Sequence, residues 1–275
     1  MDNILYSIPV SALNEYRERH VVVRAATLAD IAEALRGADL QFVPYVQLLK
    51  IPDEVCWPAE WDLPLPVDVV MTNVEEEYPK LYQCSALLAA SPVRVSIPVV
   101  PGFGKAVKLA VSLGFAVVLE VTQPDAVLVR DLHRALDLYL HHPDLCRPVE
   151  FFHSLLLACY QAAPASLWAI QEEDPAQFRY VTDEGRQILS RRLAALDPAG
   201  DYDTFLERFM AELLEQKAEC GDCEYLGICG GYFKWPDRGY ACEGIKSLFR
   251  EIRSAAEELK RDNAMFESSQ ETERP

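Results

Sequence analysis

Four of the eight cysteines in this chain lie near its C-terminal end, at Cys220, Cys223, Cys229 and Cys242. Two, five and twelve residues separate them, and the first three fall in the run CGDCEYLGICGGYFKW. Cysteine thiolates are soft ligands, and four of them complete either a zinc site or an iron–sulfur cluster. The spacing therefore predicts a metal centre held by these four side chains.

The spacing also bears on which metal is bound. Structural zinc sites usually present two closely spaced cysteine pairs, whereas here only Cys220 and Cys223 form such a pair. A [4Fe-4S] cluster is bulkier than a zinc ion, so ligands spread along a wrapping loop suit it better. Glycines in this loop allow close backbone approach and positive φ. The pattern favours one [4Fe-4S] cluster and leaves Zn²⁺ as the alternative.

Aromatic residues are interleaved with the last cysteines. We expect most of them to shield the metal centre, with a peptide-docking surface as the alternative for one or two rings. They are Tyr225, Tyr232, Phe233, Trp235 and Tyr240.

The cysteines need elements that bring them together, and the sequence predicts two flanking helices. Residues 202–219 form an amphipathic pattern that leads directly to Cys220, and residues 244–262 form another after Cys242. Residues 263–275 are expected to be a flexible tail. Before the first of these helices, residues 183–185 read Asp-Glu-Gly and predict a hairpin turn.

The first half of the chain has a different pattern. Apolar runs at 21–25, 41–49, 67–73, 93–100 and 115–122 alternate with helix-like segments such as 27–37 and 104–114. Strands rich in Val and Ile, separated by helices, predict a parallel sheet covered by helices. The alternatives are a βα barrel, partial or full, and an open doubly wound sheet, and four or five strands are too few for a complete barrel. We place a domain boundary near residue 165.

Composition excludes some classes of function. The chain of 275 residues has a formal net charge of −17 and a pI near 4.7, so the phosphates of a nucleic acid would be repelled. A basic peptide would suit this surface better. The N-terminus lacks the pattern of a secretory signal, and no segment approaches eighteen uncharged apolar residues. We therefore expect a cytoplasmic protein with no membrane span.

In the reducing cytoplasm the remaining cysteines should not form disulfides. They are scattered in or beside apolar runs, and we expect each of them to be a small buried hydrophobic residue. They are Cys56, Cys84, Cys146 and Cys159.

The order Cys-x2-Cys-x5-Cys-Gly-Gly, preceded by an acidic helix and followed by Cys242, resembles the SPASM domain. This is the C-terminal auxiliary-cluster domain of radical S-adenosylmethionine (SAM) enzymes that modify peptides and proteins. The resemblance is specific over residues 166–245 and is a likeness of pattern before them. It implies a degenerate radical-SAM-like partial βα barrel over 1–165, followed by a small Cys-rich, SPASM-like auxiliary-cluster domain over 166–262.

Departures from the family pattern are equally informative. The family's SAM-cleaving cluster needs a Cys-x3-Cys-x2-Cys motif near the N-terminus, but this chain has no cysteine before Cys56 and no three cysteines at that spacing. The ligands of one of the two auxiliary clusters are also missing, because Ser190 and Phe233 stand where the family has cysteines. The resemblance thus implies one complete auxiliary cluster on Cys220, Cys223, Cys229 and Cys242 and no SAM-cleaving cluster.

The resemblance further implies an accessory protein of the kind encoded beside radical SAM/SPASM enzymes in peptide-maturation systems such as the GeoRSP type. Its expected partners are such an enzyme and its peptide substrate, and its expected roles are docking and electron relay. By itself it is not expected to be a radical SAM enzyme. Two alternatives stay open: an enzyme with its active site in the βα domain, and a zinc-stabilised binding scaffold.

Overall fold

The computed structural model of the chain describes residues 4–51, 64–143, 145–193, 203–216 and 219–272. Its strands are β1 (Leu5–Pro9), β2 (Val21–Ala25), β3 (Val46–Leu49), β4 (Val67–Val70), β5 (Val93–Pro98), β6 (Ala116–Glu120), β7 (Val149–Glu150), β8 (Phe178–Val181) and β9 (Gln187–Ile188). Its α-helices are α1 (Leu28–Leu35), α2 (Val74–Glu77), α3 (Leu81–Cys84), α4 (Phe103–Ser112), α5 (Ala126–His141), α6 (Phe152–Gln161), α7 (Leu167–Ile170), α8 (Phe205–Glu215), α9 (Leu226–Cys229) and α10 (Glu243–Thr272). Short 3₁₀ turns connect several of them.

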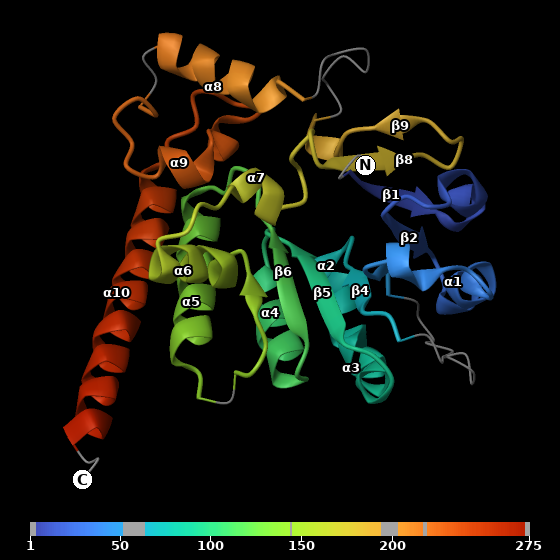
Figure 1. Ribbon diagram of the computed structural model, residues 1–275, viewed down its shortest axis with the longest axis horizontal. Coiled ribbons are helices and arrows are strands. Elements are labelled where there is room, and N and C mark those ends of the chain that lie inside the picture. Colours follow the sequence, from blue (N-terminus) through green and yellow to red (C-terminus); the bar gives the residue numbers. More distant parts are fainter. Residues whose placement is uncertain (1–3, 52–63, 144, 194–202, 217–218, 273–275) are drawn as a thin grey trace.

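All the described strands belong to one sheet, in the order β7-β6-β5-β4-β3-β2-β1-β8-β9 (Figure 1). Every neighbouring pair is parallel except β8 and β9, which form an antiparallel hairpin. The predicted α/β class with a parallel sheet is confirmed. Strands β1 to β7 follow one another in chain order, as in a βα barrel, whereas a doubly wound sheet reverses its order at a switch point.

Local residue choices account for many of the boundaries. The run 21–25 forms β2 as predicted, and the side chain of Thr27 accepts a hydrogen bond from the backbone N–H of Asp30 to cap α1. The predicted turn at 183–185 joins β8 to β9, with Gly185 at φ +79°. Helix α10 continues past residue 262 to Thr272, because residues 263–272 contain no Gly or Pro to end it.

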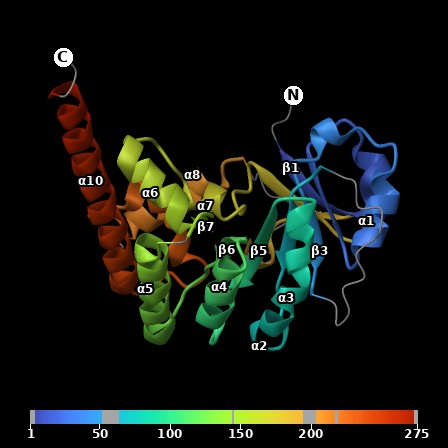
Figure 2. The ribbon, with the colours of Figure 1, turned by 90° about the horizontal axis from the view of Figure 1, so that it is seen from below.

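One face of the sheet is apolar and packs against helices. Five valines that occupy this face on neighbouring strands have no solvent exposure, and helices α1 to α5 lie outside them (Figure 2). They are Val23, Val46, Val67, Val95 and Val117. Burial of this continuous surface supplies most of the hydrophobic stabilisation of the domain.

The other face of the sheet carries polar side chains, since alternate residues of a strand point to opposite faces. Gln47, Asp68 and Arg94 are paired in register on β3, β4 and β5. Asp68 is completely buried and accepts hydrogen bonds from Gln47 Nε2 at 3.0 Å, Arg94 Nη2 at 3.0 Å and Ser96 Oγ at 2.8 Å. A buried carboxylate of this kind requires both a cation and hydrogen bonds.

The loop after α7 fills the space beside this polar face. Glu172 forms an ion pair with Arg94 on β5 at 3.1 Å. It also accepts a hydrogen bond at 2.6 Å from the hydroxyl of Tyr45, which lies just before β3. Its carbonyl accepts from the Tyr180 hydroxyl on β8 at 3.3 Å, and Gln171 donates to the Leu119 carbonyl on β6 at 3.1 Å. One short loop therefore contacts strands that are far apart in the sheet order, which requires the sheet to curve around it.

Helix α10 closes one end of the molecule, packing along α6 and α5 (Figures 1 and 2). On α5, His133 lies between two residues of α10, with Nδ1 2.7 Å from a Glu251 carboxylate oxygen and Nε2 2.9 Å from Ser247 Oγ. Within the described residues, none of the helices combines the length and apolar character that crossing a bilayer requires.

Replacing Arg94 with Met tests the buried charge network. We expect R94M to lower the free energy of unfolding by about 3 kcal/mol, because Asp68 would remain buried without its cation. Urea denaturation measures the loss. Restoring charge balance in D68L/R94M should recover part of it, whereas R134M, at an exposed ion pair, should change stability by less than about 1 kcal/mol. A loss in R134M equal to that in R94M would contradict this account.

Candidate metal centre

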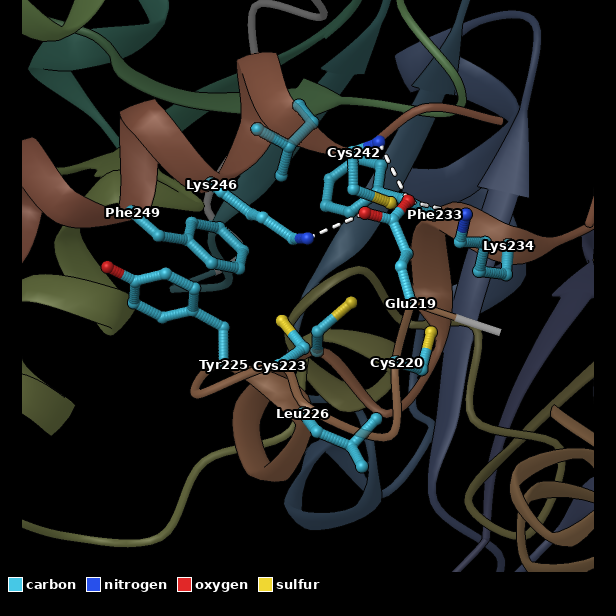
Figure 3. A pocket seen from close by; sticks show the side chains of 12 residues that line it. Glu219, Cys220, Cys223, Tyr225, Leu226, Phe233, Lys234, Cys242, Lys246 and Phe249 are labelled. Carbon is cyan, nitrogen blue, oxygen red and sulfur yellow. Dashed lines mark hydrogen bonds and ion pairs between the residues drawn. The ribbon is translucent and has the colours of Figure 1, made fainter. Parts of the chain in front are cut away.

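All four predicted ligands line a single cavity. Cys220, Cys223, Cys229 and Cys242 border it together with apolar side chains that include Ile245. Figure 3 shows Cys220 and Cys223 on one side of the cavity and Cys242 on the other. Residues up to 22 positions apart in the sequence are thus brought together by the fold.

The local backbone explains this convergence. After α8, the Cys223 N–H donates to the Cys220 carbonyl at 3.1 Å, and the one-turn helix α9 carries Cys229. Gly230 and Gly231 then adopt left-handed φ values of +55° and +72°, which turn the chain sharply. Cys242 immediately precedes α10, and its carbonyl accepts the Lys246 N–H at 2.8 Å.

Strong contacts attach this cysteine loop to the sheet. The indole of Trp168, a fully buried residue of α7, donates to the Gly230 carbonyl at 2.9 Å. The Tyr232 hydroxyl donates to the Val121 carbonyl at 2.7 Å, just beyond β6. Gln123 donates to the Phe233 carbonyl at 2.9 Å. The loop is therefore fixed at the carboxyl end of β6.

A charge network borders the cavity. Glu219 pairs with Lys234 at 2.7 Å and Lys246 at 2.6 Å, and it accepts a hydrogen bond from the Cys242 N–H at 3.2 Å (Figure 3). Burial opposes ionisation of Glu219, but the hydrogen bonds from Lys234, Lys246 and Cys242 outweigh it and lower its pKa to about 2. The ionised carboxylate holds both lysines at the rim of the cavity.

The two lysines place positive charge beside the four sulfurs. Burial raises the pKa of Cys229 to about 11 and that of Cys242 to about 12, and the pKa of Cys220 is raised by the same cause. These raised values keep the thiols of Cys220, Cys229 and Cys242 protonated without a bound cation, and a soft metal centre would supply the charge that makes them thiolates. The donor set fits either an iron–sulfur cluster or zinc.

The size of the cavity bears on which metal the four thiols could hold. The cavity is small, about 20 Å³, a size that suits a single Zn²⁺ ion better than a cluster. Among the described residues, however, no three Cys, His, Asp or Glu side chains are placed to hold one ion. A tetrahedral zinc ion with Zn–S bonds of about 2.3 Å holds its sulfurs about 3.8 Å apart. The cysteine sulfurs that ligate a cluster lie farther from one another.

The aromatic residues divide into two groups. Tyr225 and Phe233 line the cysteine cavity, in agreement with a shielding role. Tyr232 faces a different cavity, and Trp235 packs against Phe209 of α8 with ring centroids 5.5 Å apart. Tyr240 donates through its hydroxyl to the Pro124 carbonyl at 2.7 Å. Three of the five rings therefore join the loop to the rest of the fold.

Positions that hold cysteines in the resembling family have structural roles here. Ser190 donates through Oγ to Glu173 at 3.1 Å, and Phe233 is fully buried against Tyr232 and Phe249. Phe233 also lines the cysteine cavity, and Ser190 lines a second cavity at the carboxyl end of β6.

The other cysteines only partly follow expectation. Cys84 is fully buried, as predicted, and Cys159 is half-buried. The prediction was wrong for Cys146, which is exposed in the loop after α5, where the apolar run has ended. Cys56 lies outside the described residues.

The rim residues Glu219, Lys234 and Lys246 were not predicted from the sequence. Two features of the sequence indicate them. Glu219 directly precedes the first ligand, and Lys246 follows Cys242 by one helical turn, which places it on the same face of α10. Lys234, only 4% exposed, interrupts an aromatic run.

Comparison with known proteins adds no relative. A scan against protein-family models finds no match, and a search of the curated proteins finds none.

Glycine substitutions test how the loop is held. In Gly231→Ala, the new Cβ would lie 2.6 Å from Leu213 Cδ1 and 3.2 Å from Phe209, at a φ that disfavours any side chain. We expect a loss of about 2 kcal/mol in unfolding free energy. Gly227→Ala is the matched control, because nothing lies within 4 Å of its Cβ. Equal thermal denaturation midpoints for the two variants would refute the assigned geometry.

Proposed function

We propose that the chain carries one [4Fe-4S] cluster on Cys220, Cys223, Cys229 and Cys242. The observation that supports this most directly is that four thiols from separate positions of the sequence line one cavity. Their unequal spacing favours a cluster over a single ion. Binding the cluster would require the lining side chains to move outward, since the cavity is small.

A cluster with four cysteine ligands has no open iron position for a substrate, so its chemistry is electron transfer or structural support. Here it would join the loop after α8 to the beginning of α10, two segments that Glu219 already links through Lys246 and the Cys242 N–H. Metal binding can contribute about 10 kcal/mol or more to the folding of a small module. We therefore propose a structural or docking role, with electron relay as the secondary role.

We propose that this protein acts beside a separate radical SAM enzyme in the modification of a peptide or protein, in the cytoplasm. The argument rests on the resemblance of residues 166–245 to the SPASM domain and on the missing Cys-x3-Cys-x2-Cys motif. A chain with an auxiliary-cluster loop but no ligands for the SAM-cleaving cluster must obtain that chemistry from a partner.

Anaerobic reconstitution with iron and sulfide tests the cluster. The wild-type chain should bind four iron and four sulfide and gain a broad visible absorbance, and each of the four Cys→Ser changes at the ligands should reduce or abolish it. Cys146→Ser, at an exposed cysteine away from the cavity, should behave as wild type. One equivalent of zinc with no visible absorbance would instead establish the zinc-stabilised scaffold.

Incubating the reconstituted chain with SAM and a strong reductant tests its dependence on a partner. We expect no 5′-deoxyadenosine from the chain alone, because no three cysteines have the spacing of a SAM-cleaving site. Product analysis by chromatography measures this outcome. A radical SAM enzyme whose gene neighbours this one should form product, and modify its peptide more fully when this chain is present. Turnover by the chain alone would overturn the accessory role.

A further inference from the structure

A second and larger cavity lies at the carboxyl end of β6, apart from the four cysteines. It has a volume of about 640 Å³, within the range of small-ligand sites. Glu120 and Tyr180 both line it, although β6 and β8 are separated by five strands in the sheet order. The curvature of the sheet therefore creates this cavity, and the carboxyl ends of parallel strands are where βα folds bind ligands.

Glu120 is an exposed carboxylate in the lining of this cavity. It ends β6 and shares a sheet face with Ala116, which is in register with Arg94, so its side chain belongs to the polar face. Among the described residues, no group donates a hydrogen bond to its carboxylate and no cation pairs with it. The neighbouring acid Glu173, by contrast, is paired with Arg192 at 3.1 Å.

The surroundings of Glu120 are short of positive charge. Asp68, Glu172 and Glu173 act on it with negative charge, and Arg94 opposes them. Partial removal from water, followed by these three carboxylates, raises the pKa of Glu120 to about 7. Arg94 is already shared between Asp68 and Glu172.

Arg192 does not supply the missing charge. Its side chain is 6% exposed, and its two terminal nitrogens are engaged by Glu173 and by the carbonyls of Tyr232 and Trp235. Its Nε, buried at the wall of this cavity, has no acceptor among the described residues. Because that atom has no contact with solvent, Arg192 offers the cavity no free donor, and the unpaired group that faces it is the carboxylate of Glu120.

We propose that this cavity binds an organic cation, an alkylammonium or guanidinium group, through Glu120. The ring of Tyr180 lines the same cavity and suits such a group, because aromatic faces attract cations, whereas the ring of Tyr232 already carries the Arg192 guanidinium 3.9 Å from its centroid. A divalent metal ion fits less well, since no three carboxylate, cysteine or histidine groups among the described residues are placed to hold one. The cation belongs either to a free amine or to a Lys or Arg side chain of a peptide. This inference needs none of the cysteines and does not depend on the proposed cluster.

Calorimetric titration of the full chain with butylammonium, agmatine and short peptides containing one Lys or Arg tests the proposal. We expect binding that weakens at least tenfold in Glu120→Gln, because a hydrogen bond to a charged group is lost. Glu33→Gln removes the same charge at an exposed site on α1 and should bind as wild type. Affinity should also rise as the pH increases from about 6 to 8, since the cation binds the ionised form of Glu120.

Each outcome has a definite meaning. Binding of the free amines as well as the peptides identifies a small cation site, and binding of the peptides alone identifies a site for a basic side chain. Both support the proposal when Glu120→Gln is weaker. Equal binding by Glu120→Gln and wild type, equal binding of an uncharged alcohol of the same length, or displacement of the amine by millimolar Mg²⁺ would each overturn it.

Discussion

A carboxylate with no access to water determines how this molecule is organised. Asp68 lies in the middle of the sheet and has no solvent exposure, so it must be neutralised within the fold. Arg94 on the neighbouring strand provides the cation and extends to Glu172. The loop that follows α7 is thereby drawn onto the polar face of the sheet, and the strands curve around it.

The same loop carries this constraint to the cysteines. Trp168 in α7, a few residues before Glu172, donates a hydrogen bond to the Gly230 carbonyl. Glu173 accepts a hydrogen bond from the Tyr232 hydroxyl at 2.8 Å. Gly230 and Gly231 lie directly after the third ligand, Cys229. The cysteine loop is thus connected to the buried carboxylate of β4 through side-chain hydrogen bonds and through the backbone of residues 168–173.

Sequence reasoning succeeded where the information is local and failed where it depends on distant pairing. Valine-rich runs predicted β2, β4, β5 and β6, and cysteine spacing predicted the residues that meet in one cavity. The run FRYV of β8 has no such pattern, and only its pairing with β1 makes it a strand. Asp68 within VDVV and Arg94 within VRVSI mark polar positions inside apolar strands. Their partner Glu172 is far away in sequence, so local patterns do not predict the pairing.

Tyr232 connects the two cavities. Its backbone belongs to the cysteine loop, while its hydroxyl oxygen lies 2.7 Å from the Val121 carbonyl and 2.8 Å from a Glu173 carboxylate oxygen, beside the cavity of Glu120. Full burial and the adjacent Glu173 raise the pKa of its hydroxyl well above the ordinary value, so the ring remains neutral. A movement of the cysteine loop when a metal centre binds would be transmitted through this ring to Glu173. The shape of the Glu120 cavity should therefore differ between the metal-free and metal-bound protein, even though the two sites share no ligand.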